Sequence, residues 1–164
     1  MTRHLTLPKM ILLSGLLVPL APAVAQAPVA PPEPVSTVLP GEAGAALLRQ
    51  CSRPVPKASG QLWEPRPADI VRLETALPRA LHRSRALAGD PAVAGLAGWR
   101  RQYVGIVRKG RHYLYGNFFP AQAGGSGEWR LEPVVVCDGG ARFFGVEMDV
   151  KTGKITHLAF NGRV

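Results

Sequence analysis

Apolar side chains follow two different rhythms along this chain, one before residue 99 and one after it. Ile70, Leu73, Leu77 and Leu81 recur at steps of three and four residues, which predicts an amphipathic helix with one buried face. Pro78 falls inside this stretch, and we expect it to kink or restart the helix because proline has no backbone N–H.

From residue 99 onward the composition favours strands. Residues 101–108 and 111–119 are rich in Tyr, Val, Ile and Phe, and Lys109-Gly110 separates them. Two such runs joined by two turn residues predict a β-hairpin in which position i pairs with 219 − i. Both faces of this hairpin are largely apolar, so the pattern does not say which face a helix covers.

Further elements complete the expected fold. The pattern predicts a short helix over residues 42–50, a glycine-rich loop over 121–127 and a third strand over 129–137. A last hairpin is expected from strands at 143–149 and 155–160. Helices followed by strands predict an α+β domain, with an N-terminal helical layer packed on a curved antiparallel sheet of four to five strands.

The N-terminus has the features of a secretory signal peptide. Arg3 and Lys9 precede the apolar run of residues 10–18, and Ala23-Val24-Ala25 supplies the small-residue pattern that signal peptidase cleaves after. The alternative is a retained membrane anchor, but the run is about half the roughly 20 residues that a spanning helix needs. We therefore expect residues 1–25 to be removed, leaving no stable membrane insertion and a periplasmic or secreted protein.

Residues 26–40 are rich in proline. Because proline fixes φ and removes a donor, this stretch predicts an extended leader without regular structure, so the domain is expected to span residues 41–164. A proline-rich ligand for a binding domain is the alternative interpretation.

The chain is basic, with a formal charge of +9, of which Arg3 and Lys9 contribute two, so the exported form carries +7. Outside the cytosol such a surface meets anionic envelope polymers or acidic envelope proteins, and nucleic acid is not an expected partner. The plainer interpretation is that arginine here serves only as a solubilising residue.

Two cysteines, Cys51 and Cys137, lie in the region expected to be exported. An isolated pair in an oxidising compartment usually forms one disulfide, and that is our prediction. No CxxC or Cys/His cluster accompanies either residue, so we predict neither a metal site nor a cofactor.

Catalytic candidates are few. His112 and His157 lie in different expected strands, and Glu147 and Asp149 alternate onto one strand face about 7 Å apart. These four residues could build a small hydrolase, although no nucleophile-elbow motif accompanies them. The plainer interpretation is half-buried or solvated strand residues, and we assign no catalytic residue.

The expected first hairpin also carries a candidate binding surface. Basic residues interleaved with aromatic ones can bind anionic polymers through charge and stacking, although the aromatic rings could equally belong to the core. The candidate residues are Arg100, Arg101, Arg108, Lys109, Arg111, Tyr113 and Tyr115.

The segment of residues 144–155, in which a strand ends in Asp149 and turns through Thr152-Gly153-Lys154, resembles the terminal hairpin of PepSY-type and cystatin-like periplasmic modules. The chain as a whole resembles small exported bacterial proteins. The resemblance covers about 20 residues and transfers no functional residue, and it implies a binding or inhibitory role.

The sequence thus favours an exported, non-enzymatic binding module that contacts an envelope component. A small periplasmic hydrolase is one alternative. The other is an inhibitor of a protease or lysozyme that presents a rigid loop such as residues 121–127.

Overall fold

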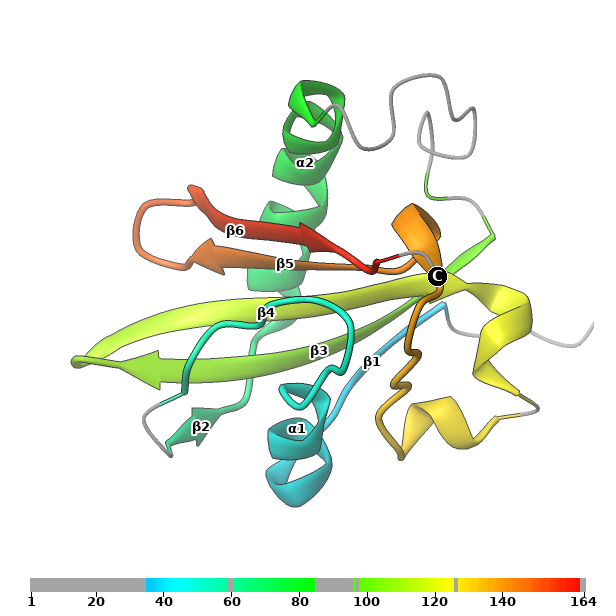
Figure 1. Ribbon diagram of the computed structural model, residues 1–164. Helices are drawn as coiled ribbons and strands as arrows, with labels where there is room; N and C mark the ends of the chain where they lie inside the picture. The colour runs from blue at the N-terminus through cyan, green and yellow to red at the C-terminus, as the bar shows by residue number, and fades with distance from the viewer. Residues whose placement is uncertain (1–34, 59–60, 85–95, 97, 126, 163–164) are drawn as a thin grey trace, which may run out of the picture. The chain divides into compact units, whose positions relative to one another are not determined.

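The two helices lie on opposite faces of one mixed, six-stranded sheet (Figure 1). The computed structural model describes residues 35–58, 61–84, 96, 98–125 and 127–162. The strand order is β1-β3-β4-β5-β6, and β2 pairs with part of β3. The main elements are β1 (Ser36–Val38), α1 (Gly41–Leu47), β2 (Leu62–Trp63), α2 (Pro67–Arg83), β3 (Trp99–Arg108), β4 (Arg111–Pro120), β5 (Phe144–Asp149) and β6 (Ile155–Phe160).

The α+β class is confirmed, but three details of the expected architecture are wrong. The sheet has six strands and is mixed, because β1 pairs parallel to β3. The helices alternate with β1 and β2 and cover different faces, so they do not form one N-terminal layer. Ser36–Val38 forms a strand within the stretch expected to lack regular structure. The strand ends before Pro40, and its three residues, none of which is proline, pair with β3. The predicted signal peptide and the rest of the leader up to residue 34 lie outside the described residues.

The β3–β4 hairpin forms as predicted, with Val104 opposite Tyr115 and Ile106 opposite Tyr113. Lys109 and Gly110 have φ angles of 52° and 70°, the left-handed pair that a two-residue turn requires to match the twist of the strands. The predicted terminal hairpin is also confirmed, with a register shift between Glu147 and Met148.

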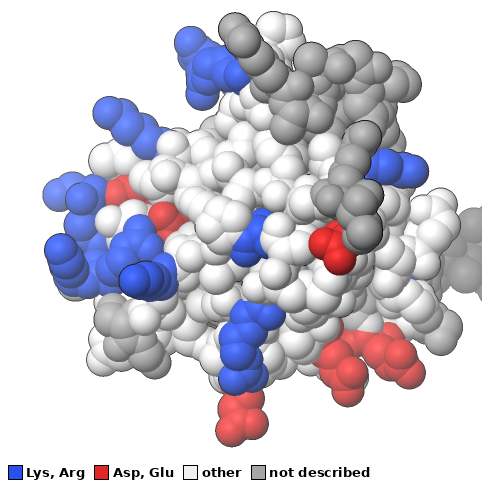
Figure 2. Space-filling view, in the orientation of Figure 1, with Lys and Arg blue, Asp and Glu red and all other residues white. Residues whose placement is uncertain are grey.

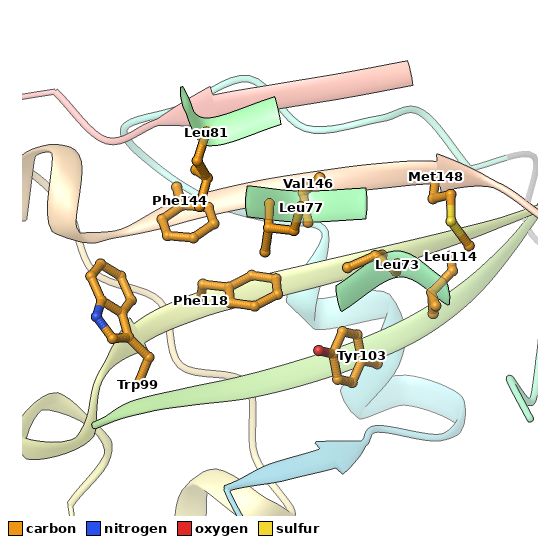
Figure 3. Close-up of a cluster of buried hydrophobic side chains, with 10 residues drawn as sticks. All are labelled: Leu73, Leu77, Leu81, Trp99, Tyr103, Leu114, Phe118, Phe144, Val146 and Met148. Carbon is orange, nitrogen blue, oxygen red and sulfur yellow. The ribbon is translucent and has the colours of Figure 1, made fainter. Parts of the chain in front are cut away.

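The α2 face of the sheet holds the larger apolar core (Figure 3). Leu73, Leu77 and Leu81, three of the four positions that predict the helix, are fully buried against the strands. Pro78 does not break the helix, which runs without interruption to Arg83, because Pro78 lies on its exposed side. The strand side of this core consists of Trp99, Tyr103, Leu114, Phe118, Phe144, Val146 and Met148.

The opposite face, which we call the α1 face, holds a second cluster. Val104, Ile106 and Tyr115 project from β3 and β4 on the side opposite Tyr103 and Leu114, and they pack against Leu47 of α1. Both faces of the hairpin are therefore covered, which is why its pattern could not assign the helix to one of them. The other members are Leu39 and Tyr113, with Ala43, Leu48, Val55 and Leu62 at the edge.

The prediction of a third strand over residues 129–137 is wrong. Glu128–Arg130 is a 3₁₀ helix, and residues 132–137, which we call the cross-sheet segment, cross the α1 face at a steep angle to the strands (Figure 1). The segment hydrogen-bonds to side chains of the sheet and not to the backbone of an edge strand. Gln102 of β3 accepts from the Val134 N–H at 2.8 Å, and Asn117 of β4 donates to the Val134 carbonyl at 2.9 Å.

A buried arginine orients the amides that hold the cross-sheet segment. Arg53 donates from its two terminal nitrogens to the side-chain oxygens of Asn117 and Asn161. Each amide NH₂ group is thereby turned toward the segment, and Asn161 donates to the carbonyl of Val136. Burial raises the pKa of the Tyr115 phenol, which accepts from Arg53, while the arginine charge opposes that rise. The three amides and the arginine together take the place of a partner strand.

The predicted disulfide is confirmed between Cys51 and Cys137, with 5.4 Å between the Cα atoms. It joins the segment after α1 to the end of the cross-sheet segment. The chain-entropy estimate for a closed loop of 86 residues is about 4–5 kcal/mol, an upper figure.

Candidate functional site

The basic surface predicted from the sequence divides between the two ends of the β3–β4 hairpin. Arg100 and Arg101 lie near one end, and Arg108, Lys109 and Arg111 lie at the turn. Arg108 lies eight residue steps along the strand from Arg100, which corresponds to about 26 Å. These residues therefore form no single patch.

The residues at the far end are occupied by internal contacts. Arg101 is 9% exposed, pairs with Glu74 at 3.2 Å and donates to the carbonyl of Leu96. Arg100 stacks on Trp129 and donates to the carbonyl of Gly125. Both arginines fix the local fold.

The two tyrosines of the predicted surface are core residues. Tyr115 is fully buried and Tyr113 is 8% exposed. Arg108 lies over the Tyr113 ring at 4.0 Å from its centre, which joins that ring to the cations of the turn.

The four residues of the hydrolase alternative do not converge. His112 packs edge-on against Trp63 at 5.0 Å on the α2 face, whereas Glu147 and His157 are paired on the α1 face. The His157 ring lies 3.0 Å from the carbonyl of Pro54. Asp149 is held by Arg111 and by the Thr152 N–H.

Glu147 is buried and bound on both oxygens. Each oxygen accepts from the Arg108 guanidinium at 2.9 Å, and Thr156 donates a third hydrogen bond to the carboxylate. The hydrogen bonds that Arg108 donates to this carboxylate raise the pKa of Arg108 against the opposing effect of burial. Glu147 thus anchors an arginine.

The turns of the two hairpins lie together at one end of the sheet and gather positive charge. The backbone N–H of Val150, in the β5–β6 turn, donates to the carbonyl of His112 on β4. Arg72 of α2 donates to the carbonyl of Val150 at 2.8 Å and so joins the same end. Figure 2 shows basic side chains gathered over this end of the sheet. We call this site the cationic turn end, and its basic residues are Arg72, Arg108, Lys109, Arg111, Lys151 and Lys154.

Two carboxylates of the β5 strand, Glu147 and Asp149, lie among these cations, and both are buried and bound to Arg108 and Arg111. Asp69, at the start of α2, pairs with Arg66 and lies close enough to Arg72 for the charge of that arginine to help lower the pKa of the Asp69 carboxyl. Within the part of the chain that the structure describes, none of the other four basic side chains, Arg72, Lys109, Lys151 and Lys154, has a carboxylate within ion-pair distance, and all four are exposed.

A groove of about 660 Å³ runs between the two turns. Its walls include Gly110 and Arg111 from one turn and Val150, Lys151 and Thr152 from the other. Burial opposes ionisation of Asp149 below the groove, but the Thr152 hydrogen bonds and the Arg111 charge outweigh it and lower the pKa of that carboxyl. An anionic group entering the groove would therefore meet the exposed Lys151 in its wall, beside an Arg111–Asp149 ion pair that is already formed.

Sequence reasoning found half of this site. Arg108, Lys109 and Arg111 were predicted, whereas Lys151 and Lys154 were treated only as parts of a turn. Both hairpin turns visibly carry lysines, but with the third strand expected over residues 129–137 the two turns would fall at opposite ends of the sheet. They lie together because that stretch is not a strand and β4 pairs directly with β5. The contribution of Arg72 depends on how α2 packs and had no signal in the sequence.

A second hollow, of about 730 Å³, lies beside α1. It is apolar, with Leu48, Val55 and Leu62 in its walls, and was not expected from the sequence.

The loop considered for an inhibitor contains the 3₁₀ helix Ala121–Gly124, and Gly124 is buried against Trp129.

The described residues contain no group of three or more His, Cys, Asp or Glu side chains placed to hold a metal ion. No helix in the described ranges is long and apolar enough to cross a membrane.

The chain was also compared with known proteins, and no protein family, curated protein or solved structure matches it. The resemblance of its terminal hairpin to PepSY-type and cystatin-like modules therefore stays a prediction.

Proposed function

We propose that this protein is an exported, non-enzymatic binding module whose cationic turn end binds an anionic polymer of the bacterial envelope. The observation that carries the proposal is the group of four exposed cations, Arg72, Lys109, Lys151 and Lys154, at the end of the sheet where a groove has Lys151 in its wall. Charges arranged in this way attract a polyanion at long range and bind several of its groups at once.

The two turns that carry the lysines of this group have defined conformations. Lys109 and Gly110 form a tight two-residue turn, and Asp149 holds the other turn by accepting the Thr152 N–H at 2.9 Å. Arg108 and Arg111 are tied to carboxylates, so they position the turns, while the four exposed cations stay available to the ligand. Export is supported by the disulfide, a bond that persists in oxidising compartments.

The test uses purified lipopolysaccharide as the polyanion and the mature protein, with binding measured by titration calorimetry at two salt concentrations. We expect binding that weakens as salt rises, because exposed charges are screened. Replacement of Arg72, Lys109, Lys151 and Lys154 by glutamine is expected to weaken binding by at least about tenfold, because each lost charge removes part of the attraction.

A matched control separates the site from net charge. Arg49, Arg79, Arg83 and Arg142 are exposed and lie outside the cationic turn end, so their replacement by glutamine changes the net charge equally. We expect this control to bind almost as well as the unaltered protein. Equal loss in both variants, or no binding to lipopolysaccharide, would contradict the proposal, and stronger binding to duplex DNA would contradict the assignment to the envelope.

A further inference from the structure

The cross-sheet segment, residues 132–137, has one edge that is hydrogen-bonded and one that is open. Its inner edge faces the sheet: the Val134 N–H and carbonyl bond to Gln102 and Asn117, and the Val136 carbonyl bonds to Asn161. The carbonyl of Glu132 also accepts from Gln102, at 2.6 Å. Inward bonds thus occur at residues 132, 134 and 136, the period of two that an extended strand shows.

The inward bonds also advance in one direction across the sheet. Glu132 bonds to Gln102 of β3, Val134 to Gln102 and to Asn117 of β4, and Val136 to Asn161 just beyond β6. The segment thus follows the bonding pattern of an extended chain, with side-chain amides in place of a partner strand on one side.

The outer edge follows from this alternation. In an extended chain the N–H and C=O of consecutive residues point to opposite sides, so those of Val135 face away from the sheet. Neither group has a hydrogen-bond partner among the described residues, and the Val135 side chain is 42% exposed. Leu131, just before the segment, is 77% exposed.

The open edge is also held in place before any partner arrives. Arg53 orients the amides of Asn117 and Asn161, and the Cys51–Cys137 disulfide fixes the end of the segment. A strand ordered in advance binds at a lower entropic cost than a flexible one.

We propose that the outer edge of the cross-sheet segment binds an extended strand of a protein partner, which pairs antiparallel with Val135 by β-strand addition. The charges at its two ends indicate the partner's composition. Glu132 and Asp138 are exposed on either side of the valines, so the matching strand has a short aliphatic centre with a lysine or arginine at each end. A second copy of this chain fits poorly, because antiparallel pairing about Val135 would place Glu132 opposite Asp138.

Pro133 restricts the pairing. It has no N–H, and Cys137 already belongs to a bend, so Val135 is the residue of the extended part through which the outer edge donates. A proline on an exposed edge is also a protection against uncontrolled strand pairing. The edge therefore suits one short strand and not a growing sheet.

The experiment titrates the ¹⁵N-labelled mature protein with the capped peptide Lys-Thr-Val-Val-Val-Thr-Lys and follows the backbone amides by NMR. We expect the largest shift at the Val135 amide, together with slower exchange of its proton. Val135→Pro removes that N–H without removing a hydrogen bond within the protein, and it is expected to weaken binding about three- to tenfold, the effect of one lost hydrogen bond. Val135→Ala keeps the N–H and serves as the matched control.

A second arm needs no change in the protein. N-methylation of the peptide's central valine removes the donor that would reach the Val135 carbonyl, and we expect the same loss of affinity. A peptide with glutamate at both ends is expected to bind more weakly, while the variant lacking the four exposed cations of the turn end is expected to bind the lysine peptide normally. No binding, shifts centred away from Val135, or equal binding by the N-methylated peptide would overturn the proposal.

Discussion

The two faces of the sheet are stabilised in different ways. On the α2 face, Leu73, Leu77 and Leu81 pack against aromatic and aliphatic strand residues in one continuous apolar core. On the α1 face, an apolar cluster beside α1 gives way to a polar one, in which Arg53 and the amides of Gln102, Asn117 and Asn161 hold the cross-sheet segment.

The two kinds of stabilisation differ in how strongly they depend on orientation. Apolar burial depends on area and volume and is shared among many neighbours, so the loss of one side chain lowers the stability of the whole domain. Hydrogen bonds between buried amides depend on orientation, and each amide in the network has its direction set by the next. We therefore expect damage to the α2 face to be global and damage to the network to be concentrated in the cross-sheet segment.

The largest effect is expected from Leu77→Ala. Leu77 is fully buried in the α2 core, and removal of its side chain costs the transfer free energy of the lost groups plus that of the cavity. We expect the free energy of unfolding, measured with urea, to fall by about 3 kcal/mol.

Val71→Ala is the matched control in the same helix, because Val71 is 62% exposed. Its effect is expected to stay within about 0.5 kcal/mol. Similar losses for the two variants would show that α2 does not pack as described.

A smaller loss of stability, concentrated in the cross-sheet segment, is expected from Arg53→Met. Methionine keeps an apolar stem of similar length but leaves the side-chain oxygens of Asn117 and Asn161 without their donor. Relief from burying a cation offsets part of this cost, and we expect a net loss of about 2 kcal/mol.

Amide hydrogen exchange distinguishes this variant from Leu77→Ala. The Val134 N–H, which bonds to Gln102, is expected to exchange faster in Arg53→Met than the fall in global stability accounts for. Arg49→Met is the control, since Arg49 is exposed. Uniform acceleration across the domain in Arg53→Met would remove the distinction between the two faces.

The same contrast explains how far the sequence could predict the fold. The α2 helix and both hairpins were predicted because each depends on local signals: a three- and four-residue apolar repeat, or two strand-like runs around a short turn. The positions of Lys109 and Gly110 even set the register of β3 and β4. Local pattern and tertiary packing agree in these elements.

The cross-sheet segment shows why the rest could not be predicted. Val134, Val135 and Val136 favour a strand and the backbone is extended, but its partners are Gln102, Asn117 and Asn161, up to 32 residues away in sequence. Nothing in a strand pattern indicates that side-chain amides will replace a neighbouring strand. The candidate site has the same limit, since the lysines of the turns were visible but the approach of Arg72 to Val150 depends on the packing of α2.

The smallest effect is expected from Asp149→Asn, and it depends on pH. The pKa of Asp149 is lowered in the folded protein, where the Thr152 hydrogen bonds and Arg111 outweigh burial. A carboxyl with a depressed folded pKa stabilises the protein above its ordinary pKa, near 3.9, and this contribution is lost as pH falls through the folded value. We expect Asp149→Asn to cost less than about 1 kcal/mol at pH 7, because Arg111 is half exposed, and the cost to shrink as pH falls through the folded pKa of Asp149.

The measurement is the urea midpoint of both proteins between pH 7 and pH 2. The unaltered protein should lose stability more steeply below pH 5 than the variant does. Some pH dependence is expected to persist in the variant, because a hydrogen bond from Arg66 lowers the pKa of Asp69 at the start of α2 against the effect of burial. If the two pH profiles ran parallel, the Asp149 carboxylate would not hold the turn in its charged form, and the cationic turn end would depend on the backbone of that turn alone.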